Sequence, residues 1–368
     1  MTDRKSIEDE EEEEDLFGET IQFDNLVLPG LTTYNNMRFS DMKEPEELIR
    51  GILRRKRKML LSGPSKSAKS CMLMELAISL TEGVPWLGFP CKKSNVLYVN
   101  LELEGTTAFS RFRKIYEEFG IDTRKIDDCL NIWNLRGFSS TIQNLAEPLV
   151  YFCIKLQIDV VIIDPIYKVL SGDENNAGEI GKVCNTLDWI ARKGNCAVIF
   201  SHHHSKGAKG NRQVLDRSSG SGVFGRDPDA ILDLIQLEPS AAALERMGEK
   251  QTTAWRMESV LREFPSIEPI NCWFQFPIHI PDPEGLLDDC STIGSYESNL
   301  AKSSRRVSMR DRETAFNQAF DELSEGGRPV KVADMARKMN VSIQTVRNRH
   351  KEVADKYWLE NNMVGRLL

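Results

Sequence analysis

Long apolar runs and paired cysteines are both missing from this sequence of 368 residues. No apolar stretch approaches the roughly 18 residues that a membrane-spanning helix needs, so we expect no membrane partner. The acidic start lacks the apolar core of a secretory signal. The eight cysteines are scattered, with no C-x-x-C pair. This pattern argues against a zinc site or a disulfide framework and favours a reducing, cytoplasmic setting.

Charge is present but unevenly distributed around a net value of −7. Residues 8–15 are all Asp or Glu, whereas residues 301–368 hold 14 Lys and Arg against 9 Asp and Glu. We expect residues 1–20 to be a disordered, solvated acidic tail; a tail that mimics a DNA strand or binds a partner is the alternative. The basic end of the chain points to a nucleic-acid partner.

Apolar strands alternate with amphipathic helices from about residue 46 to residue 240. Some strands, such as VVII at 160–163, are apolar on both faces, which is typical of a parallel sheet covered by helices. Residues 46–57 are expected to form a short helix, and residues 250–275 to add antiparallel strands at the sheet edge. The sequence therefore predicts an α/β fold with a mostly parallel central sheet.

Composition also suggests where the domains end. Residues 280–308 are rich in Pro, Gly and Ser and are typical of a linker. The expected organisation is an acidic tail at 1–20, an arm at 21–45, the α/β core at 46–278, the linker at 279–308 and a small domain at 309–368.

The stretch GPSKSAKS at 63–70 nearly matches the phosphate-binding motif G-x-x-x-x-G-K-[ST]. It lies between an expected strand and an expected helix, so backbone N–H groups and the helix amino terminus would hold phosphate oxygens. Lys69 would contact the β- and γ-phosphates, and Ser70 would bind Mg²⁺. Ala68 replaces the second glycine, and its methyl group would cost about 1–2 kcal/mol if φ had to be positive. The expected nucleotide-binding residues are Gly63, Pro64, Ser65, Lys66, Ser67, Ala68, Lys69, Ser70 and Cys71.

Carboxylates and histidines end three further expected strands. Asp164 follows four apolar residues, as in the Walker B pattern, and would bind Mg²⁺ at the carboxyl end of its strand; capping the next helix is its alternative role. Either Glu102 or Glu104 could orient the water that attacks the γ-phosphate, because alternation puts both on one strand face. His202 and His203 could sense the γ-phosphate.

A long segment rich in Gly, Ser and basic residues follows the histidines. Loops of this length often carry function, although a solvated loop is the alternative. The basic residues that could contact phosphates of ATP or of nucleic acid are Lys206, Lys209, Arg212, Arg217 and Arg226.

Five motifs, given at the end of this paragraph in chain order, resemble those of the RecA-like ATPases of the RepA type. These are the hexameric replicative helicases of plasmids, phages and integrative elements. The resemblance covers about residues 45–240. It implies a RecA-like P-loop NTPase core that uses ATP and Mg²⁺ and forms a homo-oligomeric ring, usually a hexamer, with ATP between subunits. The motifs are GPSKSAKS, NLELE, VVIIDPIYK, SHHHSKG and DRSSGSGVFGRDPD.

The same resemblance implies roles for single residues. It matches Glu102 to the catalytic glutamate, and it matches His202 to a sensor position with His203 in the paired-histidine pattern. Arg217 resembles the arginine finger that a neighbouring subunit inserts at the γ-phosphate, and Arg226 is the second candidate. Single-stranded DNA would thread the ring and contact Lys206, Lys209 and Arg212.

Residues 328–353 look like a helix-turn-helix. The first helix is expected at 332–339, followed by a turn and by a second helix that Ser342 caps, and residues 356–368 would form a β wing. Such a domain would bind duplex DNA, and a protein-interaction winged helix is the alternative. Bases would face Ser342, Gln344, Thr345 and Asn348, and phosphates would face Arg347 and Arg349.

Three functions are compatible with these patterns. The leading hypothesis is an ATP-driven, ring-forming DNA motor of a mobile element, in particular a replicative helicase that translocates on single-stranded DNA. The first alternative is a RecA-like ATPase that acts as a recombination mediator or replication loader without unwinding. The second is a sequence-specific duplex DNA-binding regulator with a slow nucleotide-binding core.

Overall fold

The computed structural model divides the chain into two compact units, which are described separately. The larger unit comprises Met1–Ser205, Val214–Leu234 and Arg256–Asp282, and the smaller one includes Pro283–Leu368. The structure describes residues 21–23, 26–28, 30–38, 43–170, 172, 176–204, 222–247, 252–282, 284–293, 309–324, 327–339, 343–350, 353–354 and 356–367. The expected acidic tail and several expected site residues lie outside these ranges, namely Lys206, Lys209, Arg212, Arg217 and Ser342.

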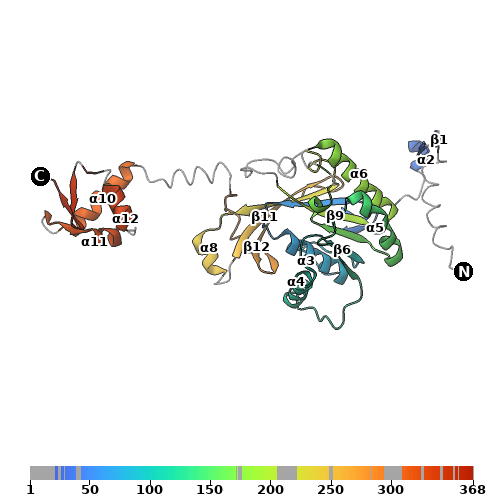
Figure 1. The fold of residues 1–368 in the computed structure, drawn as a ribbon, viewed down its shortest axis with the longest axis horizontal. Coiled ribbons are helices and arrows are strands. Elements are labelled where there is room, and N and C mark those ends of the chain that lie inside the picture. Colours follow the sequence, from blue (N-terminus) through green and yellow to red (C-terminus); the bar gives the residue numbers. More distant parts are fainter. Residues whose placement is uncertain are drawn as a thin grey trace. The chain divides into compact units, whose positions relative to one another are not determined.

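A nine-stranded sheet forms the centre of the fold, in the order β13-β12-β11-β10-β5-β9-β8-β6-β7 (Figure 1). The strands from β10 to β7 all pair in parallel, and β12 pairs with β13 in antiparallel orientation. The predicted α/β fold with a mostly parallel central sheet is therefore confirmed. The strands are β5 (Lys58–Gly63), β6 (Val96–Asn100), β7 (Leu130–Asn134), β8 (Val160–Asp164), β9 (Ala197–His203), β10 (Ala230–Leu237), β11 (Thr252–Leu261), β12 (Ile270–Gln275) and β13 (Ile278–Pro281).

Helices cover both faces of this sheet. Successive strand residues point to opposite sides, and the central strands are mostly apolar, so both faces have to be buried. Val99, Ile163 and Phe200 pack with α5 (Ile142–Leu156) and α6 (Ala177–Lys193) in one apolar cluster (Figure 1). On the other face, the ring of Tyr98 lies 5.2 Å from that of Phe112 on α4 (Gly105–Glu118). Helix α3 (Lys69–Glu82) packs beside α4 and is buried along nearly its whole length.

The prediction of a helix at residues 46–57 is wrong. Strands β3 (Glu47–Ile49) and β4 (Leu53–Arg54) pair there as an antiparallel hairpin. Gly51 takes a φ of +71° in the turn, a left-handed conformation that ends any helix and that glycine adopts without steric cost. Leu48 and Ile52 are both buried, so the apolar spacing that suggested a helix instead serves a hairpin packed on the core.

Several short elements complete the core unit. Strands β1 (Ile21–Phe23) and β2 (Leu26–Leu28) form a separate antiparallel pair, and α2 (Tyr34–Met37) follows them. A 3₁₀ helix, η3 (Ile166–Val169), comes directly after β8. Strand β13 ends at Pro281, beyond the expected end of the core at residue 278. No helix in the described part of the chain is long and apolar enough to cross a bilayer.

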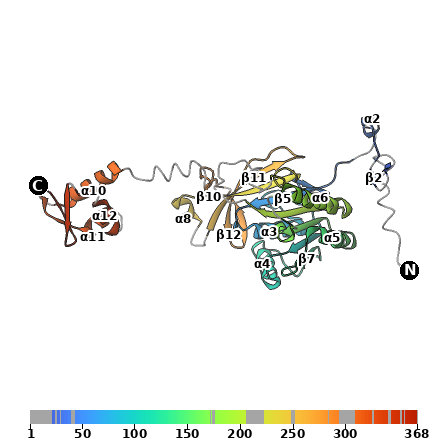
Figure 2. The ribbon, with the colours of Figure 1, turned by 45° about the horizontal axis from the view of Figure 1, so that its top comes forward.

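Residues 309–367 contain a second, smaller set of helices around a three-stranded sheet of order β14-β16-β15 (Figure 2). Phe316, Phe320, Met335 and Tyr357 are buried in its own apolar core. A small carboxyl-terminal domain of helices and strands is therefore present, as predicted. Its elements are α10 (Met309–Leu323), β14 (Val330–Lys331), α11 (Val332–Lys338), α12 (Ile343–His350), β15 (Tyr357–Glu360) and β16 (Met363–Arg366).

Candidate functional site

The loop between β5 and α3 adopts a conformation that explains where the motif needs glycine. Ala68 has φ 60° and ψ 21°, in the left-handed region, immediately before the first residue of α3. This is the costly case of the two considered for its methyl group, about 1–2 kcal/mol of backbone strain. Gly63 is required for packing instead, because an added Cβ would lie 3.0 Å from both Leu234 Cβ and Ser67 Oγ.

Lys69 is buried at the start of α3 and folds back onto the loop. Its Nζ donates to the carbonyl oxygens of Gly63 at 2.9 Å and Pro64 at 2.7 Å. Burial lowers the pKa of Lys69 to about 8, while the charges of Asp164, Glu102 and Asp233 favour its protonated form. Carboxylates from β8, from the end of β6 and from β10 therefore act on one ammonium group, whose present contacts a phosphate would have to replace.

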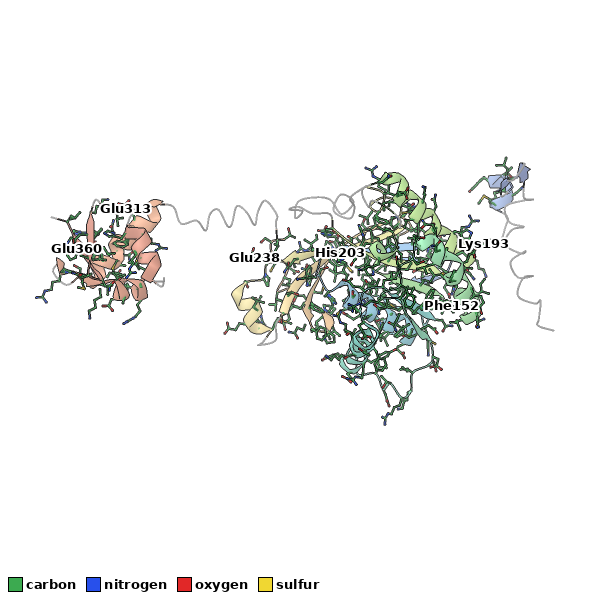
Figure 3. The ribbon with its side chains drawn as sticks, viewed as in Figure 1. Phe152, Lys193, His203, Glu238, Glu313 and Glu360 are labelled. Carbon is green, nitrogen blue, oxygen red and sulfur yellow. The ribbon has the colours of Figure 1, made fainter. Side chains whose placement is uncertain are left out.

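The histidines at the end of β9 lie beside this lysine. His203 Nδ1 is 3.0 Å from Lys69 Nζ (Figure 3 labels His203). Burial, together with the charge of Lys69, lowers the pKa of His203 to about 4, so its ring is neutral at pH 7 and Nδ1 can accept a hydrogen bond from the ammonium. His202 is buried, in register with Ser62 of β5, and its ring lies 4.9 Å from that of Phe224.

Asp164 is buried at the end of β8, where two hydroxyl groups hold it. Its carboxylate accepts hydrogen bonds from Tyr98 Oη at 2.7 Å and from Ser201 Oγ at 2.6 Å. The alternative role as a helix cap is wrong, because the residue that precedes η3 is Pro165 and no side chain caps that helix. Sequence reasoning missed both partners; the one signal was a serine that interrupts the apolar run of β9.

The two glutamates after β6 have different environments. Glu104 caps α4 and accepts from the N–H groups of Thr106 at 2.7 Å and Thr107 at 3.3 Å. The hydrogen bond from the Thr106 side chain is the main reason why the pKa of Glu104 is lowered. Glu102 is exposed, and its charge acts on Lys69. This geometry favours Glu102 as the carboxylate available to a substrate.

Three further side chains at the site were not expected from the sequence. Asn100 fixes the turn that carries Glu102, because its side chain bonds both the carbonyl (2.7 Å) and the N–H (2.9 Å) of Leu103. Asp233 is fully buried on β10 and contacts Ser62 Oγ and, at 2.5 Å, His204 Nε2. Arg111 of α4 opposes the burial that raises the pKa of Cys71 to about 12. These contacts depend on strand register and helix placement, which no motif reports.

The remaining P-loop residues line the turn itself. Ser67 is buried, whereas Ser65 and Lys66 are exposed and Ser70 is partly exposed in the first turn of α3.

Of the two arginine-finger candidates, the structure describes Arg226. Arg217 lies outside the described residues. Arg226 is exposed in the segment before β10, and this segment is bonded to Lys58, the first residue of β5. The P loop follows Gly63, the last residue of β5. Arg226 and the P loop of one chain therefore lie at opposite ends of the same strand.

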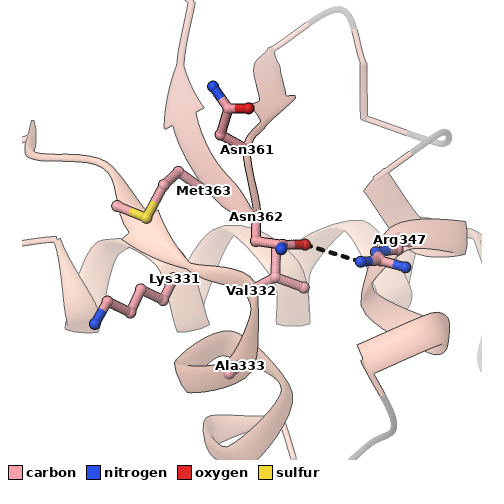
Figure 4. A pocket seen from close by; sticks show the side chains of 7 residues that line it. All are labelled: Lys331, Val332, Ala333, Arg347, Asn361, Asn362 and Met363. Atoms are coloured by element: carbon pink, nitrogen blue, oxygen red, sulfur yellow. Dashed lines mark hydrogen bonds between the residues drawn. The ribbon is translucent and has the colours of Figure 1, made fainter.

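Helix α12 in the small unit contains most of the residues that are predicted to contact DNA. The side chains of Gln344, Thr345 and Asn348 lie outside the described part of the chain, and Arg349 is partly buried. Arg347 is exposed and donates to Asn362 Oδ1 at 2.8 Å in the turn between β15 and β16 (Figure 4). This contact borders a hollow of about 310 Å³, which is lined by Lys331, Val332, Ala333, Arg347, Asn361, Asn362 and Met363.

Comparison with models of known protein families agrees with this geometry. Residues 30–209 match the AAA domain family AAA_25. The match covers slightly less than half of the chain, and with the P loop and the mostly parallel sheet it fits a RecA-like P-loop fold. The chain is also similar to a KaiC-like protein of the hyperthermophilic archaeon Pyrococcus horikoshii OT3, with 15% sequence identity over 64% of this chain and 94% of that chain and a TM-score of 0.43.

Proposed function

We propose that this protein is a ring-forming, ATP-hydrolysing DNA motor, and in particular a replicative helicase of a mobile genetic element. One observation carries the ATPase part of the proposal: three carboxylates act on the buried Lys69, namely Glu102 and Asp164 after or at the carboxyl ends of β6 and β8, and Asp233 of β10 beside the carboxyl end of β5. This is the edge where α/β sheets bind their ligands.

The P loop and the start of α3 would bind the phosphates of ATP through backbone N–H groups. Lys69 would exchange the carbonyl oxygens of Gly63 and Pro64 for the terminal phosphates. Ser70 and Asp164 offer hydroxyl and carboxylate oxygens, the hard donors that fit Mg²⁺, and they would hold the ion that neutralises phosphate charge when bound.

Glu102 would accept a hydrogen bond from the attacking water and take its proton as the water oxygen bonds to the γ-phosphorus and the bond to the bridging oxygen breaks, so that ADP leaves. His203, neutral and in contact with Lys69, would change partners when the lysine moves, so it would sense whether nucleotide is bound. An arginine finger would come from a neighbouring copy, as in a ring of subunits, usually six. Single-stranded DNA in the ring would contact Lys206, Lys209 and Arg212, with a salt-dependent affinity.

The glutamate pair gives a direct test of the catalytic assignment. Glu102→Gln is expected to lower kcat for ATP hydrolysis by roughly 10²–10⁴-fold, because it removes the general base. Glu104→Gln is the matched control: it should keep kcat and lower the thermal midpoint, because it weakens the cap of α4. Steady-state hydrolysis and thermal unfolding measure the two effects. Loss of hydrolysis in Glu104→Gln alone would contradict the assignment.

A second experiment separates the helicase from its alternatives. Wild-type protein should hydrolyse ATP faster with single-stranded DNA and should displace a strand from a forked duplex, and Lys69→Ala should do neither. DNA-stimulated hydrolysis without strand displacement would instead favour a recombination mediator or loader. Sequence-specific protection of duplex DNA with slow hydrolysis would favour the regulator.

A further inference from the structure

A set of ionic contacts fixes the segment that carries Arg226. Asp227 accepts a hydrogen bond from Lys58 Nζ, and Asp229 accepts one from the Lys58 N–H at 2.9 Å. The Lys58 carbonyl oxygen in turn accepts from the Asp229 N–H at 3.0 Å. The turn at residues 226–229 is therefore bonded through side chains and backbone to the first residue of the P-loop strand.

The lysine in this set is almost completely buried, with 3% of its side chain exposed. Burial opposes the charged form of Lys58, but its hydrogen bonds with Asp188, at 2.7 Å, and with Asp227 prevail and raise its pKa. A buried charge persists only where it is paired, and breaking such a pair is costly. The attachment of Asp227 to the core is therefore costly to break.

A second contact comes from Arg262, directly after β11. Its Nη2 donates to the carbonyl oxygen of Arg226 at 2.8 Å, and its Nη1 lies 3.3 Å from Asp229 Oδ1. The Arg262 N–H also donates to the Asp229 carbonyl oxygen at 2.9 Å. A guanidinium can make two such contacts at once because its N–H groups form a planar fork. Arg262 thus touches the backbone of Arg226 and fixes the direction in which that residue leaves the turn.

Arg226 itself is exposed, and within the described ranges no carboxylate is paired with its guanidinium. Because its backbone is held, Arg226 loses only side-chain freedom when its guanidinium meets an anion. The P loop of its own chain follows the other end of β5. The anion it fits is therefore one presented by another molecule.

We infer that Arg262 is a positioning residue for Arg226, and that together with Asp227 and Asp229 it holds Arg226 for contact with the γ-phosphate of ATP bound to a neighbouring copy of this chain. This inference rests on the proposed function. Of the two finger candidates it selects Arg226. Arg262 touches no substrate and acts only through the backbone that it holds.

The test begins with kinetics of ATP hydrolysis by the full chain. Arg226→Ala is expected to lower kcat by about 10³-fold, the effect of losing an arginine finger. Arg262→Gln is expected to lower kcat by roughly 10- to 100-fold with KM unchanged, because it misplaces the finger without removing it. Arg262→Lys, which keeps the charge but not the fork, should fall between wild type and Arg262→Gln. The matched control is Arg124→Gln, which breaks an exposed arginine–aspartate pair with Asp122 and should hydrolyse ATP at the wild-type rate.

Two further measurements distinguish positioning from a general structural role. The double variant Arg226→Ala/Arg262→Gln should be no slower than Arg226→Ala, because a residue that acts through Arg226 has nothing left to position. Mixing Arg262→Gln with Lys69→Ala should give more hydrolysis than the two variants alone. In mixed rings, an intact P loop of the first variant meets a correctly held Arg226 of the second.

The outcomes separate this inference from the function on which it rests. Additive losses in the double variant, or no gain on mixing, would show that Arg262 does not act through the Arg226 of a neighbouring copy and would overturn the inference while the motor stands. An unchanged rate in Arg226→Ala would also overturn it and leave Arg217 as the finger. No ATP hydrolysis by wild-type protein would overturn the proposed function and the inference together.

Discussion

Ala68 occupies a backbone conformation that alanine disfavours, at the position where the P-loop motif has glycine. We expect Ala68→Gly to raise the free energy of unfolding by about 0.5–1 kcal/mol. Relief of about 1–2 kcal/mol of left-handed strain exceeds the 0.4–1 kcal/mol or so of added entropy in the unfolded chain. Urea unfolding of the nucleotide-free protein measures the change.

The same substitution at a helical alanine should have the opposite sign. Ala177 is exposed in the first turn of α6, and Ala177→Gly should lower the free energy of unfolding, because glycine is a poor helix former. A decrease in both variants would show that the methyl group of Ala68 causes no net strain. Unchanged kcat in Ala68→Gly would show that this strain does not limit turnover.

Single residues also show what the sequence could and could not predict about the site. Strand ends predicted Lys69, Glu102, Asp164 and the histidines as neighbours, because parallel strands bring their carboxyl ends to one edge. The partners that hold these groups, such as Tyr98 and Ser201 around Asp164, depend on strand register and side-chain direction. The choice between Glu102 and Glu104 likewise needed the exact start of α4, which residue spacing does not fix.

At the scale of elements, α3 and β13 are joined by a buried, hydrogen-bonded glutamate–histidine pair. Glu75, in the middle of α3, lies 2.6 Å from His279 Nδ1 and accepts from the His279 N–H at 3.1 Å, and both residues are almost fully buried. His279→Ala should lower the free energy of unfolding by about 3–5 kcal/mol, because it leaves a buried carboxylate unpaired. Urea unfolding of the variant and the wild type measures this difference.

The control for this pair removes the charge as well. Glu75→Gln/His279→Ala should be more stable than His279→Ala, since the amide oxygen can still accept from the backbone N–H of residue 279 while no charge is buried. Equal stability of the single and double variants would contradict the role assigned to charge.

The pair also shows why contacts between helices and strands could not be predicted from the sequence. Apolar spacing predicted α3 correctly, but a glutamate among those apolar residues gave no indication of a histidine 204 positions away. For the hairpin of β3 and β4, apolar spacing instead predicted the wrong element. Its apolar residues fit a helical period, and only the positive φ of Gly51 decides for a turn.

At the scale of the whole molecule, the carboxyl-terminal unit has its own core and sheet, and it carries basic residues on α12. A chain that ends at residue 308 is therefore expected to keep ATP hydrolysis and its stimulation by single-stranded DNA. It should bind duplex DNA more weakly, with a shallower dependence of affinity on salt. Each phosphate contact that is lost should reduce the slope of log affinity against log salt by about 0.9.

Arg347→Ala in the full chain gives the matched single-residue measurement. If Arg347 contacts a phosphate, this variant should reduce the salt slope by about one contact's share and weaken binding equally across sequences. If its bond to Asn362 serves only to hold the β15–β16 turn, the slope should stay unchanged.

Duplex affinity that survives truncation at 308 would favour a protein-interaction role for this unit. Loss of all DNA binding on truncation would instead favour the regulator over the motor, because a ring that grips single strands needs nothing beyond its core to do so.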